Sequence, residues 1–94
     1  MHPENNPYMT DLNQQFQTAV AESKELPEKP SNEVLLQLYS LYKQSTEGDA
    51  TEDAAPANAF DFVAKAKYNA WESQKGKTKE EAMSEYVKLI EKLK

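Results

Sequence analysis

The chain of 94 residues contains no cysteine and no arginine, and it has only two glycines and one histidine. Without cysteine, disulfides, thiolate metal sites and a cysteine nucleophile are excluded. The histidine, His2, lies in an N-terminal segment that we expect to be irregular, so a catalytic triad or a histidine metal site has no ordered histidine. Gly48 and Gly76 are too far apart to form a phosphate-binding glycine loop. We therefore expect no catalytic site, no metal site and no bound cofactor.

Acidic residues outnumber basic ones, 16 against 11, which gives a formal net charge of -5. This balance disfavours general nucleic-acid binding, which depends on excess positive charge. No apolar run approaches the roughly 20 residues of a membrane span, and the N-terminus lacks the basic and apolar segments of a signal peptide. We expect a cytoplasmic protein of one domain that is not inserted in membranes, and nothing in the sequence requires more than a monomer.

Proline and asparagine in the first residues predict a flexible extension over 1–9, followed by one domain over 10–94. Apolar residues at helical spacing predict a first helix over 11–25, which is ended by two prolines. Ser31 is a suitable N-cap for a second helix, and Gly48 is suited to end it. The first half of the chain is therefore expected to be two amphipathic helices.

The segment 50–59 is rich in alanine and acidic residues, has no apolar stripe, and is expected to be a long loop. Helical spacing then resumes up to Gly76. Thr78 and Glu81 form the S/T-x-x-E pattern of a capping box at the start of a last helix. Helices this short are stable only when they bury their apolar stripes against one another. The predicted fold class is all-α, a small four-helix bundle.

Two tyrosines and a lysine lie beside the apolar stripe of the second helix. At 100° per residue and measured from Val34, Tyr42, Tyr39 and Lys43 lie at about 80°, 140° and 180°. Aromatic rings with an adjacent cation can stack on a flat ring and hold an anion beside it. The alternatives are packing at the edge of the core with a solvated lysine, or a helical protein-interaction module that docks a partner on Tyr39 and Tyr42.

Two further candidates have equally ordinary interpretations. Lys67 and Trp71 are four residues apart in the third helix, where a solvated lysine beside a core tryptophan is common. Tyr86 falls in the apolar stripe of the last helix, so its hydroxyl needs a partner or an opening to water. Neither position by itself indicates a ligand.

Three segments taken together resemble the acyl-CoA-binding protein family: LYSLYKQSTEGD at 38–49, KAKYNAW at 65–71 and KGKTKEEAMSEYV at 75–87. The resemblance extends from about Phe16 to the C-terminus. It implies a four-helix bundle with up-down-down-up directions and no catalytic step. The implied ligand is the thioester of a long-chain fatty acid and coenzyme A, which such a carrier sequesters and transports inside the cell.

The resemblance also implies a ligand site of aromatic, basic and apolar positions: Tyr39, Tyr42, Lys43, Lys67, Tyr86, Lys24 and Val20. Lys43 and Lys67 are implied to meet the 3'-phosphate of the ribose, and Tyr86 to lie near the adenine. Val20 takes a position that is commonly small in the family, which would narrow the groove near the first helix. The loop at 50–59 is longer than is usual in the family.

Overall fold

The computed structural model describes residues 7–94, with side chains from residue 11 onward. This part of the chain forms four α-helices, one short 3-10 helix and no strand. The elements are α1 (Pro7–Glu22), α2 (Asn32–Glu47), η1 (Glu52–Ala54), α3 (Phe62–Glu72) and α4 (Lys79–Leu93). The expected all-α four-helix fold is confirmed, and the expected long loop contains η1.

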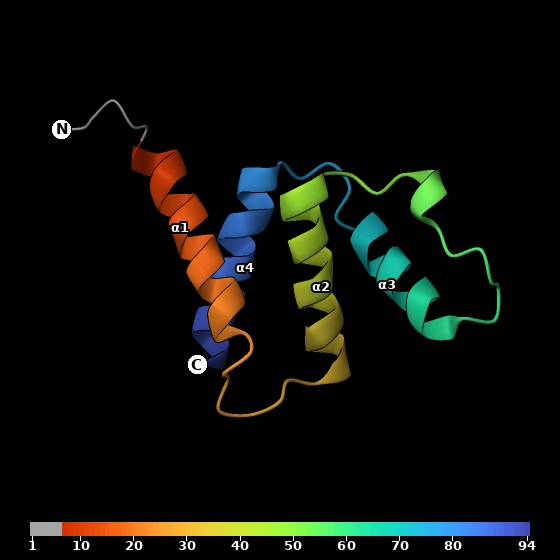
Figure 1. Cartoon of the computed structure of the whole chain (residues 1–94), viewed down its shortest axis with the longest axis horizontal. Helices are drawn as coiled ribbons and strands as arrows, with labels where there is room; N and C mark the ends of the chain where they lie inside the picture. The colour runs from red at the N-terminus through yellow and green to blue at the C-terminus, as the bar shows by residue number, and fades with distance from the viewer. Residues whose placement is uncertain (1–6) are drawn as a thin grey trace.

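The helices lie side by side in an order that differs from their order along the chain. Helix α4 packs against both α1 and α2, whereas α3 packs against α2. Figure 1 shows that α1 and α4 run in one direction and that α2 and α3 run in the other. These are the up-down-down-up directions that the resemblance implied. Helix α2 is therefore the element that joins the core to α3.

Helix α1 begins at Pro7, earlier than the predicted range of 11–25. Proline is tolerated in the first helical turn, because the N–H that it lacks would have no partner there. Positions 7–9 are therefore helical, although the predicted flexible extension over 1–9 included them. The remaining residues of that predicted extension, 1–6 with His2, lie outside the described residues.

Helix α1 also ends earlier than predicted, at Glu22. The Ser23 hydroxyl donates a hydrogen bond of 2.6 Å to the carbonyl oxygen of Val20. The N–H of Lys24 donates to the carbonyl oxygen of Ala21 at 3.2 Å. This bond joins residues three positions apart, as in a 3-10 turn, instead of four positions apart as in an α-helix. Residues 23–25 consequently form a turn, and the apolar spacing could not distinguish it from a further helical turn.

The predicted caps of the next helices are confirmed. The Ser31 hydroxyl accepts from the N–H of Val34 at 3.2 Å, and Gly48 ends α2 with a φ of 82°, in the left-handed region that favours glycine. At the start of α4, the N–H of Glu81 donates to the Thr78 hydroxyl at 3.0 Å, and the Glu81 carboxylate accepts from the N–H of Thr78 at 2.9 Å. Both donors are thereby satisfied.

The hydrophobic core lies between α1, α2 and α4. Its buried residues are Phe16, Ala19, Leu38, Leu41, Ala82, Tyr86 and Ile90. The Phe16 ring stacks on Tyr42 at a centroid distance of 6.0 Å and forms a T-shaped pair with Tyr86 at 5.2 Å. Because Phe16 touches rings from both neighbouring helices, it holds α1 in place.

Helix α3 contributes little to this core, since Trp71 is its one buried residue. Phe62 and Val63, which continue the helical spacing of the apolar residues, are 71% and 67% exposed. The described part of the chain therefore leaves most of the surface of these two side chains uncovered. Core packing therefore does not explain why these two exposed positions carry apolar side chains.

We expect Phe16→Ala to destabilise the fold by about 3 to 5 kcal/mol, because it removes a fully buried ring between two others and leaves a cavity. Urea unfolding followed by circular dichroism measures this loss. The matched control is Gln17→Ala, an exposed change in the same helix that should alter the free energy of unfolding by less than about 0.5 kcal/mol. A loss below about 1 kcal/mol for Phe16→Ala would contradict the central place of this ring.

Candidate functional site

Two hydrogen bonds link α3 and the turn that follows it to α2 and its C-cap. The indole N–H of Trp71 donates to the carbonyl oxygen of Gly48 at 2.8 Å. The side-chain amide of Gln74 donates to the hydroxyl of Ser40 at 3.0 Å. Trp71 is 6% exposed, so its N–H would be costly to leave unpaired. The distance between the two helices is therefore set by hydrogen bonds as well as by apolar packing.

A second network ties the end of α2 to the turn before α4. The Gln44 side chain is fully buried, and its amide nitrogen donates to the Asp49 carboxylate at 2.7 Å and to the Lys77 carbonyl at 2.9 Å. The N–H of Gly76 donates to the same Asp49 oxygen at 3.0 Å. Donation from Gly76, and secondarily from Gln44, lowers the pKa of the Asp49 carboxyl from its ordinary value of 3.8.

A polar hollow of about 280 Å³ lies between α2, α3 and the loop that joins them. Lys43 from α2 has its Nζ atom 4.9 Å from the ring centroid of Trp71 on α3. Lys67 from α3 has its Nζ atom 5.4 Å from the ring centroid of Tyr39 on α2. Each helix thus places a lysine over an aromatic ring of the other helix. Both lysines and both rings line the hollow.

Lys43 is also paired with an acid. Its ammonium group forms an ion pair with the carboxylate of Glu47, one turn further along α2. The hydrogen bond to Glu47 is the main reason that the pKa of Lys43 is raised, and partial burial opposes that rise. Lys43 is therefore a firmly charged cation at neutral pH, at the wall of the hollow.

An apolar groove of about 400 Å³ adjoins the polar hollow. Its walls are Leu35 and Leu36 from α2 and Phe62, Val63 and Ala66 from α3, and Asn32, Tyr39 and Lys67 complete its lining. Tyr39 and Lys67 line both spaces, so the groove and the hollow are neighbours that share these two residues. The exposed apolar side chains at the start of α3 are therefore one wall of a groove.

This arrangement suits an amphipathic ligand. Two ammonium groups can hold an anionic group, aromatic faces can stack on a flat ring, and the groove can cover an alkyl chain. Within residues 11–94, no group of three or more His, Cys, Asp or Glu side chains is placed to hold a metal ion. No helix in residues 7–94 is long and apolar enough to cross a membrane.

The sequence profile of the family described as "Acyl CoA binding protein" matches residues 13–90. The acyl-CoA-binding protein of Dictyostelium discoideum is 49% identical over 78 residues, which are 83% of this chain and 90% of that protein. The chain belongs to the acyl-CoA-binding protein family. The family protein of Saccharomyces cerevisiae is 42% identical over 82 residues, covering 87% of this chain and 92% of that protein.

The crystal structure of Oryza sativa acyl-CoA-binding protein 2 has the same fold. The two structures align with a TM-score of 0.80 and 39% sequence identity, over 87% of this chain and 89% of the rice chain. The helix arrangement of Figure 1 is therefore an acyl-CoA-binding protein fold. The identification that the three sequence segments indicated is confirmed.

The structure brings only some of the family-implied site residues into one place. Tyr39, Lys43 and Lys67 line the polar hollow. Tyr42 is 40% exposed and stacks on Phe16, on the side of α2 that faces α1. Tyr86 is 4% exposed against the same phenylalanine, and this burial raises the pKa of its hydroxyl, which a hydrogen bond with Ser23 partly offsets.

Val20 and Lys24 lie away from the hollow. Val20 is half-buried and packs against the core cluster. Lys24 is exposed in the turn after α1, at the end of the bundle where α2 begins, whereas Lys43 is three turns further along α2. Neither residue lines the polar hollow or the apolar groove.

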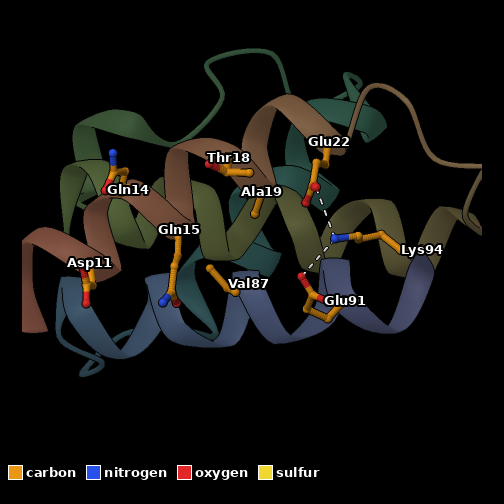
Figure 2. Close-up of a pocket in the computed structure, with 9 residues that line it drawn as sticks. All are labelled: Asp11, Gln14, Gln15, Thr18, Ala19, Glu22, Val87, Glu91 and Lys94. Carbon is orange, nitrogen blue, oxygen red and sulfur yellow. Dashed lines mark hydrogen bonds and ion pairs between the residues drawn. The ribbon is translucent and has the colours of Figure 1, made fainter.

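A larger hollow of about 580 Å³ lies on another face, between α1 and α4 (Figure 2). It contains none of the family-implied site residues. Its charged lining is three acids and one lysine, and that lysine, Lys94, pairs with Glu22 and Glu91 at 3.2 Å each. Figure 2 shows these carboxylates turned toward the Lys94 ammonium group. Such a lining repels a phosphate-bearing ligand, so this hollow is a poor candidate for acyl-CoA.

Sequence reasoning missed several residues of the polar hollow. The loop between α2 and α3 contributes Ala54 and Pro56 to the lining of the hollow. No sequence pattern near these two residues predicts that they lie beside α3. Glu47 was overlooked, although Lys43 and Glu47 have the four-residue spacing of a helical ion pair. Reading that spacing would have found the acid that shares the hollow with the lysines.

The lowered pKa of Asp49 predicts a specific loss of stability in acid. The folded carboxyl has a lower pKa than the unfolded one, so its stabilising effect is present above about pH 4 and disappears as the pH falls through the folded pKa. Asp49→Asn keeps an acceptor oxygen but removes the charge. We therefore expect a lower Tm than native at pH 7, with the two Tm values converging toward pH 2. In Glu28→Gln, an exposed control, the difference from native should be small at both pH values.

Proposed function

We propose that this chain binds one long-chain fatty acyl-CoA across the polar hollow and the adjoining apolar groove, as a non-catalytic carrier. The observation that carries this proposal is that Tyr39 and Lys67 line both spaces. A ligand with a phosphate-rich end and an alkyl end would pass these two residues and place one end in each space. Membership in the acyl-CoA-binding protein family supports the same ligand.

The phosphate-bearing end of the ligand would lie at Lys43 and Lys67. Both ammonium groups line the hollow from opposite walls, and Lys67 pairs with no carboxylate among the described residues. Each charge-assisted contact to a phosphate contributes about 1.5 to 3 kcal/mol. Two such contacts are enough to distinguish the CoA ester from a free fatty acid.

The acyl chain would lie in the groove between α2 and α3. Each buried methylene contributes about 0.8 kcal/mol, so a 16-carbon chain contributes up to roughly 12 kcal/mol before the costs of ordering it. Leu35, Phe62 and Val63 gain most, because their exposed side chains would be covered by the chain. The ligand thus completes an apolar surface that the fold leaves open.

The second aromatic cluster has a supporting role in this proposal. The exposed face of Tyr42 would stack on the adenine, while its other face rests on Phe16. Tyr86 is buried and would act through Phe16 by holding that ring under Tyr42. Lys24 would meet a phosphate only if the ligand extends toward the turn after α1, and Val20 would set the packing of α1 beside the site.

The alternative, a protein-interaction module on Tyr39 and Tyr42, receives no support from the comparisons. The two rings also face different neighbours, because Tyr39 lies under Lys67 of α3 and Tyr42 stacks on Phe16 of α1. They do not form one continuous docking face. A cytoplasmic location, a monomeric state and a domain over 10–94 remain predictions.

Calorimetric titration with palmitoyl-CoA, palmitate and CoA at one salt concentration tests the carrier. We expect one-to-one binding of the thioester, with palmitate and CoA each far weaker. Affinity should rise with acyl length by at most about fourfold per methylene, and by less where the groove is open. Palmitate binding as tightly as palmitoyl-CoA would contradict the proposal, and hydrolysis of the thioester during incubation would contradict a non-catalytic role.

Lys43→Ala and Lys67→Ala should each weaken palmitoyl-CoA binding by about 10-fold to 150-fold, which corresponds to loss of one charge-assisted contact. Tyr42→Ala should weaken it through lost stacking. Lys65→Ala is the matched control, since Lys65 is an exposed lysine on α3 that lines neither space. Thermal unfolding checks that each variant is folded. Equal affinity for native and all three site variants would show that the ligand binds elsewhere.

A further inference from the structure

Glu47 is the one acid that lines the polar hollow together with Lys43 and Lys67. Its carboxylate is paired with the Lys43 ammonium group, and the same ammonium group lies 4.9 Å from the Trp71 ring centroid. The Lys43 side chain is 22% exposed and the Glu47 side chain 53% exposed. The lysine is therefore held in place from two sides, and the acid remains open to solvent and to a ligand.

The hollow is consequently lined by charges of both signs, and these partly cancel. Two lysines and one glutamate leave a formal charge of +1 at its walls. More acids lie beside it: the pKa of the Tyr68 hydroxyl, which also lines the hollow, is raised by burial and by the negative charges of Glu72, Glu52 and Asp53. The site is much less positive than its two lysines alone would make it.

An arriving phosphate must compete with Glu47. The lysine ammonium group has three N–H donors, and the ion pair with Glu47 engages part of that capacity. A phosphate bound at Lys43 also comes close to a second negative charge, which costs free energy at a partly desolvated site. We infer that Glu47 is a built-in competitor that lowers the affinity of the hollow for the phosphate of its ligand; this inference rests on the proposed acyl-CoA function.

The physical consequence is a carrier that releases its ligand more readily. The ion pair engages Lys43 and not Lys67, which pairs with no described carboxylate. Glu47 therefore competes directly with the phosphate at one of the two lysines. Since affinity differences of this kind act mostly on the dissociation rate, removal of Glu47 should lengthen the residence time of the ligand.

The test is calorimetric titration of native protein, Glu47→Gln and Glu33→Gln with palmitoyl-CoA and with its analogue lacking the 3'-phosphate. Glutamine is nearly isosteric and removes only the charge. We expect Glu47→Gln to bind palmitoyl-CoA about three to ten times more tightly than native, and the analogue with a smaller gain. Glu33→Gln, an exposed change at the far end of the same helix, should bind as native does. Stopped-flow measurement should show slower dissociation from Glu47→Gln.

The possible failures can be told apart. If native protein does not bind palmitoyl-CoA, the proposed function is wrong and this inference falls with it. If native protein binds but Glu47→Gln binds equally or more weakly, the inference alone is overturned. A gain that is the same for Glu33→Gln, or the same for the analogue without the 3'-phosphate, also overturns it, because the effect would then come from net charge rather than from competition at Lys43.

Discussion

The hydrogen bond from the Trp71 indole to the Gly48 carbonyl is the contact on which the candidate site depends. Helix α3 adds one buried residue to the core, so apolar burial alone holds it weakly. The bond joins α3 to the residue where α2 ends, and Gly48 can present its carbonyl there because a positive φ is open to glycine. The contact therefore helps to fix the walls of both the hollow and the groove, together with the hydrogen bond from Gln74 to Ser40.

Helix α2 serves two neighbours at once. Leu38 and Leu41 face the core, while Tyr39 and Lys43 face α3. The division follows from the helical repeat, since residues one position apart lie about 100° apart around the helix. A change on the core face would therefore alter the site only by moving the whole helix, and a change on the α3 face can alter ligand contacts while the core stays intact.

Sequence patterns within a few residues predicted the helices and their caps. The features that they could not predict depend on contacts between residues far apart in the sequence. The caps at Ser31 and Thr78 depend on side chains within three residues of the backbone that they cap, so sequence alone identified them. By contrast, Phe62 and Val63 have helical spacing, but spacing cannot show whether another element covers them. The placement of Lys43 over Trp71 likewise depends on how α2 and α3 pack, which no segment encodes by itself.

Charge shows why a whole-chain sum is a poor guide to ligand binding. The net charge of -5 predicts repulsion of a polyanion, yet two lysines face one hollow. At physiological ionic strength, exposed charges are screened beyond about 8 Å, so distant acids such as Glu22 and Glu91 on the α1 and α4 face act weakly there. Glu47, in contact with Lys43, is screened far less than these distant acids. The arrangement of charge within one screening length therefore decides which anion binds and how firmly.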